Sequence, residues 1–179
     1  MKTLVTSALL VAALSIAGVR AQQSPAAPPA APTAADFQRS LARTWKSLHD
    51  KILVMAKDPM FPDEKLGWKP HPDARSVLEE FRQVTLGLEL ASAQLRGEKL
   101  TGPGVAARRK ADADKPKTRA SVVSDMEAAI AVSYPLVEKS PNPLLVGWIE
   151  DQAEHYGKLV SNYRAVGIVP PSSRQPAPQ

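Results

Sequence analysis

The sequence has no cysteine among its 179 residues, which excludes disulfides, thiolate metal sites and a cysteine nucleophile. It has only three histidines, so there is little room for a metal site built from several imidazoles. It also lacks a G-x-S-x-G segment and a glycine-rich phosphate-binding loop. The remaining composition, with 23% charged and 44% hydrophobic residues, is that of an ordinary globular domain and identifies no activity.

Proline is abundant, with 17 residues, and many of them lie near the two ends of the chain. Residues 22–35 are rich in proline and alanine and carry no charge, which predicts an extended linker. Residues 174–179 are predicted to form a disordered tail for similar reasons. The folded domain is therefore expected at residues 36–173.

Residues 1–21 are typical of a secretory signal peptide. Lys2 precedes an apolar run at 4–17, and Ala21 ends a segment suited to cleavage. The run is shorter than the roughly 20 residues of a membrane-spanning helix, although an uncleaved anchor is the alternative. Cleavage would lower the net charge from +5 to +3, because Lys2 and Arg20 are lost. We expect an exported protein, periplasmic or extracellular, without a transmembrane helix after cleavage.

Between the two ends, hydrophobic residues recur at three- and four-residue steps in four segments, which predicts four amphipathic helices. These begin near Asp36, Ser76, Thr118 and Asn142. Pro135 is expected to kink or interrupt the third helix. The fold class is therefore predicted as all-α, a four-helix bundle with a long loop at 96–117 between its second and third helices.

Three stretches of the sequence form a recognisable pattern. They are Trp68-Lys69-Pro70-His71-Pro72-Asp73-Ala74-Arg75-Ser76, Leu95-Arg96-Gly97-Glu98-Lys99, and Glu154-His155-Tyr156-Gly157-Lys158-Leu159-Val160 with Tyr163-Arg164 and Gly167 to Ser173. Together they resemble the DinB-like (DinB/YfiT) superfamily, in particular its exported members, and the resemblance covers nearly all of residues 36–173.

The resemblance implies a four-helix bundle, often a homodimer, with a divalent metal held by three histidines. One ligand lies on the second helix and two lie four residues apart on the fourth. Here His155 matches one ligand position, but Asp151 and Gln83 stand at the other two. The sequence therefore departs from the family pattern at two of its three metal ligands.

Two hypotheses follow from this departure. An altered site built from His155 and Asp151, completed by Gln83 or Glu80, would bind zinc, nickel or manganese and serve a divalent-metal-dependent transferase or hydrolase. Alternatively the site is eroded, no metal is bound, and the protein has a non-catalytic binding or structural role for a small molecule or protein partner. We prefer the second hypothesis, because imidazole ligands largely set zinc and nickel affinity. Whether the protein is an enzyme stays open.

The other histidines are weaker candidates. His49 lies at the edge of the first apolar stripe and is expected at the bundle boundary, whereas His71 is expected in a solvated loop. Residues 108–119 carry a net charge of +4 and could meet anionic lipid or polysaccharide. Nucleic acid is not an expected partner, because no aromatic residue is interleaved with these cations for base stacking.

Overall fold

The computed structural model describes residues 31–139 and 142–174, nearly all within the unit Pro32–Gln179. The predicted signal peptide, most of the predicted linker and residues 175–179 of the predicted tail lie outside this part. The described residues are all-helical, as predicted, without a strand. They form α1 (Ala34–Ala56), a 3-10 turn (Asp63–Lys65), α2 (Val77–Leu95), α3 (Gly102–Ala113), α4 (Arg119–Lys139), α5 (Leu144–Ala165) and a second 3-10 turn (Pro171–Ser173).

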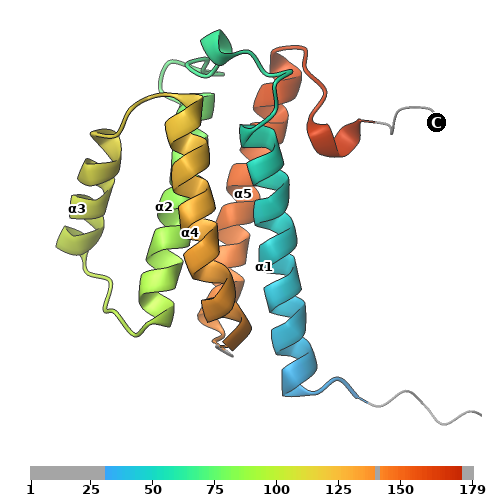
Figure 1. Cartoon of the computed structure of the whole chain (residues 1–179), viewed down its shortest axis with the longest axis vertical. Helices are drawn as coiled ribbons and strands as arrows, with labels where there is room; N and C mark the ends of the chain where they lie inside the picture. Colours follow the sequence, from blue (N-terminus) through green and yellow to red (C-terminus); the bar gives the residue numbers. More distant parts are fainter. Residues whose placement is uncertain (1–30, 140–141, 175–179) are drawn as a thin grey trace, which may run out of the picture. The chain divides into compact units, whose positions relative to one another are not determined.

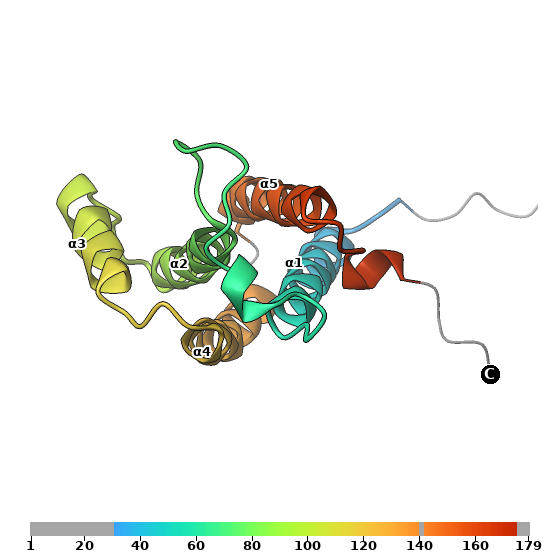
Figure 2. The same cartoon turned by 90° about the horizontal axis from the view of Figure 1, so that it is seen from above.

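Helices α1, α2, α4 and α5 run alongside one another and surround a common interior (Figure 1). The largest contacts join α2 to α4, α1 to α4 and α2 to α5, with α1 and α5 also in contact. Seen from above, α3 lies outside these four helices, next to α2 (Figure 2). The fold is thus a helical bundle with one additional helix on its flank.

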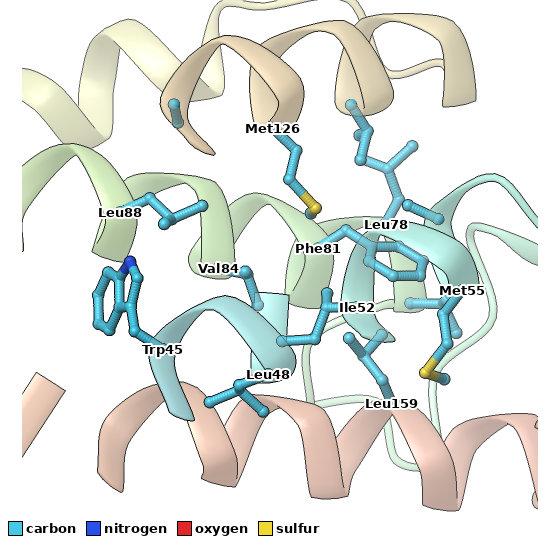
Figure 3. Close-up of a cluster of buried hydrophobic side chains, with 14 of the residues drawn as sticks. Trp45, Leu48, Ile52, Met55, Leu78, Phe81, Val84, Leu88, Met126 and Leu159 are labelled. Atoms are coloured by element: carbon cyan, nitrogen blue, oxygen red, sulfur yellow. The ribbon is translucent and has the colours of Figure 1, made fainter. Parts of the chain in front are cut away.

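The interior is filled by large apolar side chains from all four packed helices (Figure 3). Trp45, Phe81 and Met126 are at most 1% exposed. The indole Nε1 of Trp45 donates to the Ser133 hydroxyl at 3.2 Å, so its polar atom is satisfied inside the core. This apolar burial supplies the main driving force for packing the four helices.

A capping box begins α2. The Ser76 hydroxyl accepts from the Glu79 amide at 3.2 Å, and the Glu79 carboxylate accepts from the Ser76 amide at 2.7 Å. Gly97 follows the helix with φ of +86°, a conformation that favours glycine and that ends the helix. The capping box and Gly97 therefore set the two ends of α2. The capping box also fixes Glu80 in the first turn of this helix.

The prediction of a long loop at 96–117 is wrong, because residues 102–113 form α3. The Thr101 hydroxyl caps this helix by accepting from the Gly104 amide at 3.2 Å, and Pro103 lies in its first turn. No residue of α3 is buried. The helix lacks an apolar stripe, which is the signal on which the sequence prediction depended.

Of the kink or interruption predicted at Pro135, the interruption is wrong, since α4 continues through it to Lys139. The residue four positions earlier, Ala131, is exposed like Pro135 itself. Water can therefore bond the carbonyl that loses its helical partner.

By length and composition, α4 is the one helix of the described residues that could cross a membrane. In the structure it packs against α1 and α2 through five buried residues. Its Asp125 pairs with Arg82 of α2, and its Glu127 pairs with Lys57. These contacts are those of a core helix of the bundle.

The segment after α5 returns to the end of α1. Arg174, the first residue of the predicted tail, pairs with both carboxylate oxygens of Asp58, which is 3% exposed. Although burial raises the pKa of Asp58, the Arg174 guanidinium holds it below its ordinary value. Tyr163 of α5 donates to the Met55 carbonyl at 2.6 Å close by. These bonds tie the C-terminal segment to the bundle.

Candidate functional site

Three of the four predicted site residues meet where α2 packs against α5. Glu80 lies in the first turn of α2, and Asp151 and His155 lie one turn apart on α5. His155 Nδ1 is 2.7 Å from Glu80 Oε2, and His155 Nε2 is 4.0 Å from Asp151 Oδ1. The imidazole therefore lies between two carboxylates supplied by different helices.

The contact between His155 and Glu80 is buried, with the residues 7% and 5% exposed. A carboxylate only accepts hydrogen bonds, so Nδ1 carries the proton and donates to Glu80. This bond fixes the orientation of the ring and leaves Nε2 directed toward Asp151, whose side chain is half exposed. Arg75 Nη1 lies 3.9 Å from the second Glu80 oxygen and adds a cation to the group.

Gln83, the fourth predicted site residue, does not join this group. It lines a separate cavity on the α3 side of α2, together with Glu79 and Arg82. Among the described residues, no group of three histidine, cysteine or acidic side chains is arranged to hold a metal ion. Structural and catalytic zinc sites use at least three protein ligands, so the residues present do not fit the metal centre implied by the family resemblance.

A chain of buried polar groups continues from Asp151 into the bundle. Gln152 Nε2 donates to Asp151 Oδ2 at 3.1 Å, and Gln152 Oε1 lies 3.3 Å from His49 Nε2. His49 Nδ1 is 2.7 Å from the Trp45 carbonyl. A Cβ on Gly87 of α2 would lie 2.0 Å from Gln152 Nε2, so the absence of a side chain there makes room for this amide.

The prediction that His49 lies at the boundary of the bundle is wrong, because the residue is 0% exposed. Burial lowers the pKa of its imidazole to about 4, since a charged ring would lose its hydration. His49 is therefore neutral at neutral pH and acts as a hydrogen-bonded core residue. His71 lies in an exposed loop, as predicted, where its Nδ1 accepts from the Asp73 amide at 3.2 Å.

A cleft of about 890 Å³ opens beside Glu80 and is bordered by α5 and the loop that precedes α2. Arg75, Lys158 and Asn162 line it along with Glu80. Asn162 is 5% exposed, and its side-chain amide forms no hydrogen bond with another described residue. A nearly buried amide without a protein partner at the wall of a cleft is suited to bonding a ligand or water.

Sequence reasoning missed Asn162 and Arg75 as site residues. Asn162 follows His155 by seven residues, two helical turns, so both lie on the same face of α5. That spacing was a usable signal. Arg75 precedes α2 and carries no periodic signal, so only the folded loop brings it to Glu80.

Neither the family models, nor the curated proteins, nor the solved structures compared with this chain give a match.

Proposed function

We propose that this chain is an exported helical-bundle protein of the DinB-like type that binds a small polar molecule without catalysis and without a tightly bound metal. The resemblance of Trp68–Ser76 and of residues 154–173 to exported DinB-like proteins supports the family, and the apolar run near Lys2 supports export. The all-helical bundle is compatible with both.

The observation that carries the proposal is the buried hydrogen bond between His155 and Glu80 at 2.7 Å. Glu80 satisfies the donor of the imidazole, and Arg75 lies close to the second Glu80 oxygen. The hydrogen bonds and charges of His155, Glu80 and Arg75 are thus satisfied within the protein. These residues require no metal ion to balance their charge.

The cleft beside Glu80 supplies the binding site in this proposal. Its size lies in the range of small-molecule sites, and most of its lining residues are polar, with Asp73, Glu154 and Ser161 beside the groups already named. The Asn162 amide can both donate and accept, whereas Arg75 and Lys158 only donate. A small molecule that carries acceptor oxygens and at least one donor would match this lining.

The competing hypothesis is a divalent-metal-dependent transferase or hydrolase. One feature favours it: Nε2 of His155 faces the half-exposed carboxylate of Asp151 at 4.0 Å. That arrangement offers two donors, and a third would have to come from elsewhere. The two hypotheses differ in the metal that the purified protein retains.

The test is elemental mass spectrometry of the purified protein after incubation with zinc, nickel or manganese and desalting. We expect no retained metal that depends on His155, so wild type, His155→Ala and His71→Ala should give the same low content. His71→Ala is the matched control, since it removes an exposed histidine whose ring bonds the Asp73 amide and not Glu80. Near-stoichiometric metal lost only in His155→Ala would overturn the proposal in favour of the metal-dependent enzyme.

A further inference from the structure

A second cavity of about 360 Å³ adjoins the cleft and shares Asp73, Ala74 and Arg75 with it. It is bordered by α2, by the loop before α2, and by α3 with the segment that follows it. Six cationic side chains from these elements line it. They are Lys69, Arg75, Arg82, Arg109, Lys115 and Lys117.

Only three acidic side chains line the same cavity. Glu79 accepts from the Ser76 amide in the α2 capping box and lies 3.7 Å from Lys69, and Asp112 accepts from Arg82 at 3.1 Å. The side chain of Asp73 is 93% exposed and lies near His71. With six cations against these three carboxylates, the lining has a net charge of +3.

Two of the cations, Arg109 and Lys117, form no ion pair with any described residue. The electrostatic effect of Lys117 is nevertheless visible at Glu79. The Ser76 hydrogen bond lowers the pKa of that carboxyl, and Lys69 and Lys117 lower it further. Arg109 and Lys117 are thus free to bond an incoming group.

The cavity keeps its form because α3 is held by charge. Arg82, 5% exposed, bonds Asp112 on α3, Asp125 on α4 and the Pro116 carbonyl between them. Since α3 has no fully buried side chain, apolar burial contributes little to holding it. Arg82 thereby occupies Asp112 and fixes the helix that carries Arg109.

We propose that this cavity binds a small, multiply charged anion of the phosphate class, held by Arg109 and Lys117 with Lys69 and Arg75 nearby. A guanidinium matches two phosphate oxygens at once, and ammonium groups add point charges. Leu78 and two alanines are the apolar part of the lining, which offers no aromatic face for a base. The lining therefore selects a compact anion over a nucleic acid strand.

The test is isothermal titration calorimetry of the full protein with inorganic phosphate and with pyrophosphate. We expect saturable binding of pyrophosphate with a dissociation constant on the order of 1 mM or tighter, and weaker binding of phosphate. The double variant Arg109→Gln/Lys117→Gln should weaken binding by at least about tenfold, because it removes both unpaired cations.

The matched control is Lys99→Gln/Lys110→Gln, which removes two exposed charges, one of them on α3, outside the cavity lining. It should change the affinity by less than about twofold, since exposed charges at a distance are screened by salt. Equal losses in both double variants, or no saturable binding by wild type, would overturn the proposal. His155→Ala should bind pyrophosphate like wild type, which separates this site from the cleft beside Glu80.

Discussion

Two regions of this molecule are held together by different forces. The interior among α1, α2, α4 and α5 buries large side chains such as Trp45 and Phe81 almost completely. Helix α3 buries none, and its attachment runs through Arg82, whose guanidinium bonds Asp112 and Asp125. Apolar burial thus fixes the four packed helices, whereas ion pairs centred on the buried Arg82 fix the fifth.

The difference has a functional consequence. A region closed by apolar packing leaves little room for solvent, and its polar atoms find partners within the protein, as the Trp45 indole does at Ser133. A region held by ion pairs leaves polar space, and both the basic cavity and Arg109 lie there. The comparison predicts that substitutions in the interior affect the whole fold, whereas those around α3 act locally.

The largest expected effect is that of Trp45→Ala, which empties the centre of the core. We expect a loss of about 4 kcal/mol in the free energy of unfolding, measured by urea denaturation. Val105→Ala, at a half-buried position on α3, is the matched comparison and should cost about 0.5 kcal/mol. Similar losses from the two substitutions would contradict the division into two regions.

A second effect comes from the neutral buried imidazole of His49. Its pKa is lowered from 6.5 to about 4, so the unfolded chain binds a proton between these pH values while the folded chain does not. Stability contributed by neutral His49 is therefore complete above pH 6.5 and is lost as the pH falls to about 4. We expect a loss of about 3 kcal/mol across this window.

Urea denaturation at a series of pH values measures this loss, with His49→Gln and His71→Gln compared. The first variant should flatten the pH dependence, and the second should leave it unchanged, because His71 is exposed. Asp58 and Glu79 act at lower pH, since the ordinary pKa values from which they are lowered are 3.8 and 4.5. An unchanged slope in His49→Gln would show that another group causes the effect.

The third and smallest effect is expected at the attachment of α3. Arg82→Met preserves bulk but leaves Asp112 and Asp125 with Lys115 as their remaining cation. We expect about 2 kcal/mol of destabilisation, because both carboxylates are only partly buried. Hydrogen exchange should show amides 102–113 losing protection before those of α1 and α5.

Arg108→Met is the control for this substitution. Arg108 lies on α3 and pairs with Glu98 at the surface, where such pairs contribute little. If α3 keeps its exchange protection in Arg82→Met, the helix is attached by other contacts and the comparison fails.

The four packed helices were predictable because burial imposes a period on the sequence. Trp45, Ile52 and Met126 fall on the stripes from which the helices were inferred, and all are buried. α3 was not predictable by the same means, because its stability comes from a cap, from helix-forming alanines and from an ion pair to Arg82. Cap and composition are local signals, but the Arg82 contact joins residues 30 positions apart.

The candidate site divides in a similar way. The i, i+4 spacing placed Asp151 and His155 on one face of α5, and the structure brings Glu80 to them. Gln83 follows Glu80 by less than one turn, yet it lines the cavity on the other side of α2. The burial of His49 was missed because Gln152, 103 positions away, comes within 3.3 Å of its Nε2 only in the folded bundle.

The central claim is that Glu80, and no metal ion, holds His155. Nitrogen-15 NMR of the histidine rings tests it most directly, because the chain has only three histidines to assign. We predict a protonated Nδ1 on His155, with both of its ring nitrogen signals unchanged when one equivalent of zinc is added. A zinc-dependent shift of His155 Nε2, with His71 unaffected, would contradict the account.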